Sequence, residues 1–178
     1  MLEILGYIAI GLVAVVAGIF AVAARKPDDF GFARTARIAA PPSQLFGLIN
    51  DLKQMNTWNP YALRETAGSS SYSGSASGVG AWHDFAGAKS GTGHIEILES
   101  TPNARVLLRL FMSKPFQADN RVEFTLVPEG PATAVTWAMS GKQPILAKVM
   151  TLFVDCEKMV GKDFDEGLAN LKAKAERG

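Results

Sequence analysis

One stretch decides the fold of this chain: Gln143–Arg177, with the sequence QPILAKVMTLFVDCEKMVGKDFDEGLANLKAKAER. Its apolar residues recur at the spacing of one helix face. Five of its charged residues fall on the opposite arc: Lys148, Lys158, Lys162, Asp165 and Lys172. The proline near its start fits the first turn of a helix. We therefore predict one long amphipathic helix here. Its apolar positions are Ile145, Val149, Leu152, Phe153, Cys156, Met159, Val160, Phe164, Leu168 and Leu171.

The length of this helix restricts how it packs. About 30 residues at a rise of 1.5 Å make a rod of about 45 Å. Such a rod is too long for a compact bundle in a chain of 178 residues, whereas a curved sheet wrapped around it would bury its apolar face. Gly161 and Gly167 mark points where the helix approaches such a sheet closely, or two tolerated weak points.

The chain before this helix has the patterns of strands and two short helices. Alternation predicts a first strand at Phe30–Ala39, and two prolines then open helical pieces that end at Trp58. Tyr61–Thr66 is predicted as a short strand, and the Gly- and Ser-rich residues 68–80 as a loop or irregular hairpin. Five more strands are joined by short turns, which indicates an antiparallel meander. These are Val79–Phe85, Gly93–Ser100, Arg105–Met112, Ala118–Val127 and Ala132–Gly141.

The chain begins with an uncharged apolar run, Ile4–Ala24, long enough to cross a hydrocarbon core of about 30 Å. We predict a transmembrane anchor at residues 1–26, followed by one domain at residues 27–178. A cleaved signal peptide is the alternative, but it requires basic residues ahead of the apolar run, and here Glu3 precedes it. The basic pair Arg25 and Lys26 follows the run, which favours a single-pass protein of the inner membrane with its domain in the cytoplasm.

The composition limits which cellular compartment and which kinds of partner suit the chain. The single cysteine, Cys156, fits a reducing compartment and excludes an internal disulfide. Of 18 basic residues two flank the apolar run, and of 17 acidic residues one precedes it, so the remaining domain is close to neutral. No basic stripe interleaved with aromatic residues occurs, and we therefore expect no nucleic-acid partner.

Short motifs follow one another in a fixed order along residues 32–176. They are Ile38–Pro42 with Leu45 and Phe46, Trp58–Pro60, Gly78–Gly80 with Trp82, Gly91–Gly93 with Ile95, Thr133–Trp137, and Asp163–Leu168 with Leu171 and Lys172. In this series the chain resembles the SRPBCC superfamily, the START-type helix-grip proteins, and within it the polyketide cyclase/dehydrase-like branch.

The resemblance implies an α+β fold in which a seven-stranded antiparallel sheet grips the C-terminal helix around a deep cavity. It implies binding of lipids, sterols, polyketides or other apolar molecules, and in some members cyclase activity or partner binding. The resemblance implies no common set of catalytic residues, so the fold alone does not predict a reaction here.

Residues with catalytic or metal-binding chemistry are sparse. His83 and His94 lie on consecutive predicted strands, where they could form an acid–base pair or supply two metal ligands. Two ligands do not make a zinc site, so hydrogen-bonded sheet histidines are favoured, and we expect no metal and no cofactor. Asp163 falls near the centre of the apolar arc, where an unpaired carboxylate is costly to bury. Arg109 is its candidate partner; a structural ion pair or an exposed Asp163 is the alternative.

Four aromatic residues are the candidate cavity walls, although aromatic residues on strands more often form core. With the two charged candidates they make the predicted ligand-binding set: Trp58, Trp82, Arg109, Trp137, Phe153 and Asp163. The predicted function is membrane-anchored binding of a hydrophobic small molecule or lipid between sheet and helix. Two alternatives stay open: a cyclase- or dehydratase-like enzyme acting on such a ligand, and a membrane-tethered module that binds a protein partner.

Overall fold

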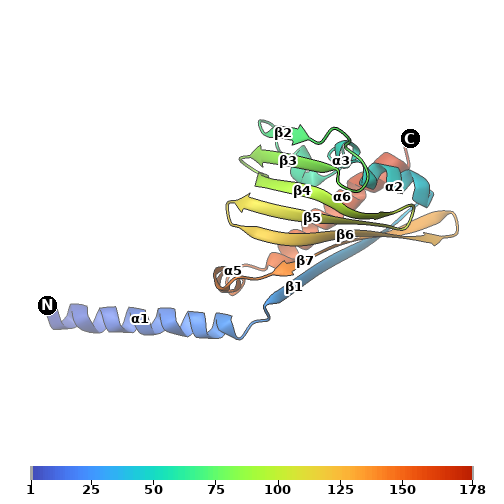
Figure 1. Ribbon diagram of the computed structural model, residues 1–178. Helices are drawn as coiled ribbons and strands as arrows, with labels where there is room; N and C mark the ends of the chain where they lie inside the picture. The colour runs from blue at the N-terminus through green and yellow to red at the C-terminus, as the bar shows by residue number, and fades with distance from the viewer. Residues whose placement is uncertain (1, 178) are drawn as a thin grey trace. The chain divides into compact units, whose positions relative to one another are not determined.

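The structure, a computed structural model, describes residues 2–177. Its contacts separate two compact units. The first contains the residues up to Phe30 together with Lys142–Cys156, and the second contains Gly31–Gly141 together with the residues from Glu157 onward. Figure 1 colours the elements of both units in chain order.

A seven-stranded antiparallel sheet makes up most of the second unit (Figure 1). Strands that follow one another from β2 to β7 are also neighbours, as expected for a meander with short turns. The first strand lies beside the last. In sheet order the strands are β1 (Asp29–Ile38), β7 (Ala132–Lys142), β6 (Ala118–Glu129), β5 (Arg105–Lys114), β4 (Gly91–Thr101), β3 (Trp82–Gly87) and β2 (Ser69–Tyr72).

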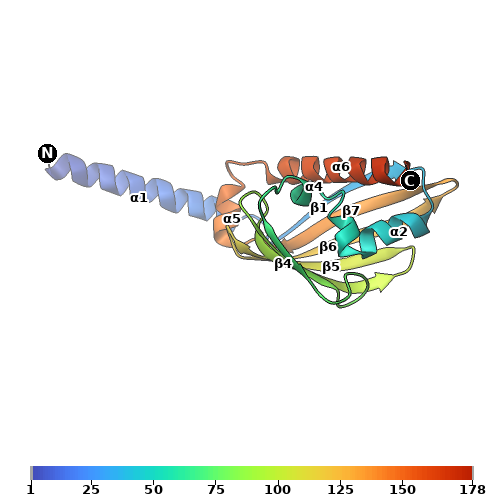
Figure 2. The same ribbon diagram turned by 90° about the horizontal axis from the view of Figure 1, so that it is seen from above.

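Helices cover the inner side of this curved sheet, as Figure 2 shows. Between β1 and β2 the chain forms α2 (Pro42–Asn50), α3 (Leu52–Met55) and α4 (Pro60–Leu63), and after β7 it reaches α6 (Cys156–Ala175). The α3 turn begins where the Asp51 carboxylate accepts hydrogen bonds from the Lys53 and Gln54 amides. The predicted pair of short helices after the first strand is therefore confirmed.

The inner face of α6 forms the centre of the core. Phe164, Leu168 and Leu171 are at most 2% exposed and recur at helical spacing. A Cβ atom at Gly167 would collide with the Trp137 ring, and one at Gly161 would collide with the Arg34 guanidinium. Gly167 therefore permits the close approach of helix and sheet that the sequence suggested, whereas the flexible Arg34 side chain could move aside at Gly161.

The prediction of one continuous helix over residues 143–177 is wrong. The structure contains α5 (Ile145–Met150) and α6, with a break between them. The Thr151 hydroxyl donates to the Lys148 carbonyl at 2.8 Å, and the next amides form tighter turns, Leu152 to Val149 and Phe153 to Met150. The apolar spacing continues across this break, so periodicity alone could not reveal it.

The predicted strand at Tyr61–Thr66 is also wrong, because residues 60–63 form α4. Pro60 occupies its first turn and the Asn59 side chain accepts from the Tyr61 amide at 3.1 Å, which is the capping pattern of a helix start. The seventh strand is instead β2, within the Gly- and Ser-rich segment. It pairs with β3 from Ser69 opposite Ala86 to Tyr72 opposite His83.

The first unit combines α1 (Leu2–Ala24) with α5. The Gly6–Ala24 part of α1 has a mean hydropathy of 2.5, and almost none of it is buried within the protein. α1 therefore has the length and composition of a membrane span or of a signal sequence.

Candidate functional site: a pocket between sheet and helices

A pocket of about 510 Å³ lies within the second unit. Its volume falls in the range of small-molecule sites, roughly 300–1,000 Å³. Most of its lining is apolar and comes from the inner positions of the strands, from α3 and from α6. The large apolar lining residues are Leu52, Met55, Phe85, Ile95, Leu110, Met112, Val122, Phe124, Trp137, Met139 and Phe164.

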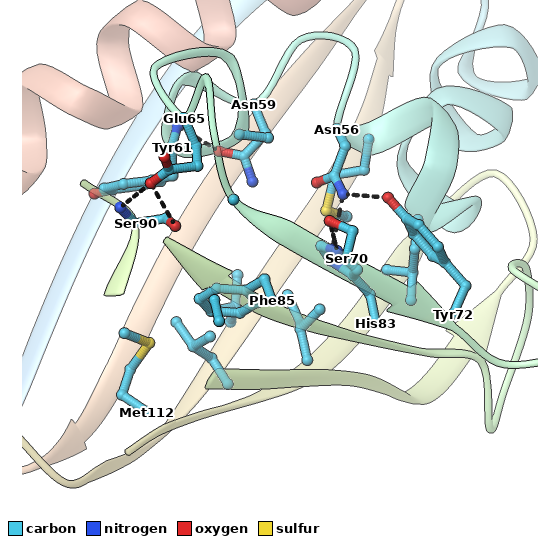
Figure 3. A pocket seen from close by; sticks show the side chains of 18 of the residues that line it. Asn56, Asn59, Tyr61, Glu65, Ser70, Tyr72, His83, Phe85, Ser90 and Met112 are labelled. Atoms are coloured by element: carbon cyan, nitrogen blue, oxygen red, sulfur yellow. Dashed lines mark hydrogen bonds between the residues drawn. The ribbon is translucent and has the colours of Figure 1, made fainter. Parts of the chain in front are cut away.

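A polar cluster of four side chains forms one part of the wall, as Figure 3 shows. Asn56 donates from Nδ2 to the Tyr72 hydroxyl at 2.8 Å and lies 3.3 Å from His83 Nδ1. His83 Nε2 lies 3.0 Å from Ser70 Oγ, and the imidazole stacks on the Tyr72 ring with centroids 4.3 Å apart. Because Asn56 donates to Nδ1, the ring proton belongs on Nε2, where it is donated to Ser70.

Burial sets the charge of His83. The residue is 6% exposed, and desolvation lowers the pKa of its imidazole below the ordinary value of 6.5; nearby Asp84 acts in the opposite direction. The neutral imidazole is therefore the form that the pocket wall favours at neutral pH.

Glu65 and Tyr61 belong to a second polar part of the pocket wall (Figure 3). The Glu65 carboxylate accepts from the Lys89 amide at 2.9 Å, the Ser90 amide at 3.1 Å and the Ser90 hydroxyl at 3.2 Å. These backbone hydrogen bonds lower the pKa of Glu65. Burial, followed by the charge of Asp163, raises the pKa of Tyr61, so its hydroxyl remains protonated. Glu65 therefore holds the β3–β4 turn as an anion.

Two polar atoms of the pocket lining have no hydrogen-bond partner in the protein: Asn120 Oδ1 and Trp137 Nε1. Asn120 is 8% exposed and Trp137 is 4% exposed. The other buried tryptophan behaves differently, because Trp58 Nε1 donates to the Leu48 carbonyl at 2.9 Å. Each unpaired buried group costs about 1–3 kcal/mol, so these two are exceptions that require an explanation.

The structure separates the predicted site residues. Only Trp137 lines the pocket. Trp58 is 1% exposed and belongs to the core, edge-on to Phe124 and Trp137. Trp82 stacks on His94 at 5.9 Å, and Phe153 belongs to the first unit and is 72% exposed. The placement of these three on the cavity wall is therefore wrong, and a ligand contact by Trp137 stays a prediction.

The predicted pairing of Asp163 with Arg109 is wrong. Asp163 Oδ1 accepts from Arg64 Nη1 at 2.7 Å, which is the structural ion pair that the sequence left as an alternative. Arg109 instead forms a forked pair with Asp119, at 2.9 and 2.5 Å. Leu108 and Leu110 point inward, so Arg109 between them points outward. Neither charged residue lines the pocket.

The two histidines lie on opposite faces of the sheet. In the β3–β4 register His83 lies opposite Ile95, while Asp84 lies opposite His94. Successive strand residues point to opposite faces, so the histidines cannot meet across the hairpin. His94 Nδ1 pairs with Asp84 at 2.6 Å away from the pocket lining.

Sequence reasoning missed Asn56, Ser70, Tyr72 and Asn120. Asn120 alternates with Val122 and Phe124 on β6, so the period of two placed an amide on the inner face. That signal was readable from the sequence. Ser70 and Tyr72 lie on a strand whose Gly- and Ser-rich composition indicates a loop, so nothing marked them.

Comparison with known proteins agrees with this architecture. A family model described as polyketide cyclase / dehydrase and lipid transport matches residues 29–176. The chain belongs to this family. No curated protein matches the chain.

Solved structures with the same fold have low sequence identity to the chain. Protein MLL2253 from Mesorhizobium loti is 16% identical, with a TM-score of 0.63 over 83% of this chain and 98% of its own. The Aha1 dimer from Colwellia psychrerythraea is 17% identical, with a TM-score of 0.60 over 83% and 96%. A Thermobifida fusca protein is 22% identical, with a TM-score of 0.60 over 83% and 93%. At these identities the likeness shows the fold alone.

The lowered pKa of His83 predicts a pH effect on stability. Below about pH 6.5 the unfolded chain binds a proton that the folded imidazole resists. The free energy of unfolding therefore falls as pH drops below that value, and His83→Gln reduces this fall. Urea denaturation followed by tryptophan fluorescence at about pH 7.5 and about pH 5.5 measures both slopes. Equal pH dependence in the two proteins would contradict the assignment.

Proposed function

We propose that this chain is a membrane-anchored protein that binds a hydrophobic small molecule or lipid in the pocket of its second unit. The pocket is the observation that carries the proposal. It is mainly apolar, it has a few convergent polar groups, and its volume of about 510 Å³ suits a small ligand. The family description, which includes lipid transport, supports the same class of ligand.

The membrane part of the proposal rests on α1. Ten of its large apolar side chains, between Ile4 and Val22, are exposed among those described, which is unfavourable in water and favourable in a bilayer. We assign residues 1–26 as the anchor and residues 27–178 as the ligand-binding domain. Arg25 and Lys26 favour a cytoplasmic domain at the inner membrane. The short link between Ala24 and Asp29 then keeps the binding domain close to apolar solutes.

Binding is better supported than catalysis. Of the three groups expected in an enzyme of this kind, His83, Arg109 and Asp163, only His83 lines the pocket. Its Nε2 proton is committed to Ser70 in the observed hydrogen-bond arrangement, so the pair lacks the acceptor that a general base needs.

Filling the pocket should remove the ligand. Leu110→Trp puts a large ring into the pocket, while Arg109→Trp puts the same ring on the outer face of the same strand. Native mass spectrometry of full-length protein, purified from membranes in nanodiscs, should show an apolar molecule retained by wild type and by Arg109→Trp. Leu110→Trp should retain several-fold less, with a thermal melt showing that it is folded.

Two results of that experiment would contradict the proposal. One is a wild-type protein that retains no small molecule and binds none from a lipid extract. The other is equal retention by wild type and folded Leu110→Trp.

Anchoring by α1 is tested separately. The full-length chain should stay in the membrane pellet after extraction with alkaline carbonate, and its intact mass should include residues 2–24. Deletion of residues 2–24 should move most of the protein into the supernatant. A mature chain that has lost α1 and is found in the soluble fraction would show a signal sequence instead.

A further inference from the structure

The charge of the pocket lining restricts what it binds. Among the described residues that line the pocket, none is Lys or Arg, and the one carboxylate is Glu65. Glu65 already accepts from Lys89 and Ser90, and the pKa of His83 is lowered so that its ring is neutral. A carboxylate or phosphate group inside this pocket would have no cation to offset its desolvation.

The two unpaired polar atoms indicate what the ligand does carry. Trp137 Nε1 can only donate, and Asn120 Oδ1 accepts. In the β6–β7 register Trp137 lies opposite Phe124, four residues along the strand from Asn120. At about 3.3 Å per residue the two backbones are separated by roughly 13 Å along the sheet. The two atoms therefore belong to lining residues at separate points of one apolar wall.

Because both atoms are buried, leaving them unpaired lowers the stability of the ligand-free protein. A tryptophan or asparagine buried without a partner destabilises the ligand-free protein, and Phe or Leu would fill the same space without that cost. Both atoms are buried beneath the pocket surface. A small shift of the side chains that cover them would let ligand oxygens satisfy both groups. A carbonyl, ether or hydroxyl oxygen can accept from Trp137, and a hydroxyl can donate to Asn120.

We propose that the pocket selects neutral, largely apolar molecules that carry hydrogen-bonding oxygens, and rejects anionic ones. The proposal rests on the proposed binding function and names its ligand class. Trp137 recognises an acceptor oxygen, and Asn120 recognises a hydroxyl.

Four probes on one ring skeleton test this selectivity: fluorene, 9-fluorenone, 9-fluorenol and fluorene-9-carboxylate. Titration calorimetry uses full-length protein in nanodiscs, with empty nanodiscs subtracted. Wild type should bind fluorenone and fluorenol about fivefold more tightly than fluorene, since one buried hydrogen bond is worth about that factor. The carboxylate should bind more weakly than fluorene.

Two variants assign the polar points. Trp137→Phe should lose the preference for fluorenone over fluorene, and Asn120→Leu should lose the preference for fluorenol over fluorene, while fluorene still binds to both variants. Asn120→Leu should also melt at or above the wild-type temperature without ligand, because it removes an unpaired amide. A folded Asn120→Leu with unchanged fluorenol preference would contradict the role of that residue.

The outcomes separate the two proposals. If none of the four probes and no molecule of a lipid extract binds, the binding function itself fails. If fluorene binds as tightly as fluorenone, or the carboxylate binds most tightly, binding stands and the ligand class is overturned.

An independent observation lies in the first unit. We call residues 145–154, which comprise α5 and the turn after it, the α5 surface. It carries a row of large apolar side chains that are exposed, led by Phe153 at 72% and Leu146 at 64%. The others are Ile145, Met150 and Val154. Soluble surfaces rarely gather so many large apolar side chains on ten consecutive residues.

Hydrogen bonds fix the α5 surface to the chain just after α1. Lys26 Nζ donates to the Thr151 carbonyl at 2.8 Å and to its hydroxyl at 2.9 Å. Lys148, 5% exposed, donates from Nζ to the Lys26 carbonyl at 2.9 Å and to Asp28 at 2.5 Å. The α5 surface is therefore held at the C-terminal end of α1, where a span would leave the bilayer.

We infer that the α5 surface inserts into the headgroup and upper acyl region of the bilayer that α1 crosses. This inference rests on the proposed anchor. A short amphipathic segment with Phe and Leu on its free side is of the kind that lies in the interface plane, and exposed Arg25 beside it suits anionic headgroups. The α5 surface thus continues the apolar surface of α1, and we assign the same bilayer to both.

Fluorescence quenching tests the insertion in nanodiscs of phosphatidylcholine and phosphatidylglycerol. Cys156→Ser removes the single cysteine, and Phe153→Cys then takes an NBD label. Doxyl groups near the lipid headgroup should quench this label, and aqueous iodide should not. Val13→Cys on α1, labelled in the same way, is the matched control and should be quenched by doxyl groups deep in the acyl chains.

Each result has one meaning. A label at residue 153 that iodide quenches and doxyl lipids do not would overturn the inference, and so would a label that neither quenches, since protein then covers the surface. If the label at residue 13 is not quenched by any doxyl lipid, the α1 anchor has failed.

Discussion

The stacking of Trp137 on Phe164 fixes the position of α6 on the sheet, and the rest of the second unit depends on it. The two rings lie 4.4 Å apart and are almost parallel. Gly167, one turn along α6, leaves room for the edge of the same indole. An apolar helix face, a flat indole and a missing Cβ thus define one contact. Because α6 is held there, its Phe164 ring becomes a pocket wall rather than a plug.

The same indole links the core to the pocket. Trp137 packs edge-on against Trp58 and stacks on Phe164, and these contacts leave its Nε1 without a partner. Trp58, a residue of the same type a few ångströms away, satisfies its own donor on the Leu48 carbonyl. The contrast is informative because buried donors are almost always bonded. Stability alone would not favour an unpaired indole and an unpaired amide on the same wall.

The sequence predicted much of the fold because most of its signals are local. Alternating apolar residues and turn-forming separators predicted β3 to β7 to within a few residues, and Pro41 and Pro42 predicted the helix after β1. The break at Thr151 could not be predicted, since it depends on a hydroxyl competing for a carbonyl while the apolar spacing persists. At α4 the Asn59–Pro60 pair was a stop signal for one helix and a start signal for the next, and only the stop was recognised.

The site was less predictable than the fold. Arg109 lies between Leu108 and Leu110 in the sequence, which concealed its outward direction. The polar cluster depends on β2, whose sequence does not resemble a strand, and on Asn56 at the end of α3, 14 residues before Ser70 in the chain. Such clusters result from tertiary pairing, whereas the inner position of Asn120 followed from the period of two.

The indole N–H signal of Trp137 in a ¹H–¹⁵N spectrum measures the central claim most directly. The chain has three tryptophans, and the Trp137→Phe variant assigns the signal. Adding fluorenone should shift the Trp137 signal strongly downfield and leave that of Trp58 nearly unchanged, because Trp58 already donates to Leu48. A Trp137 signal that does not move while fluorenone binds would show that the pocket is not the site of recognition.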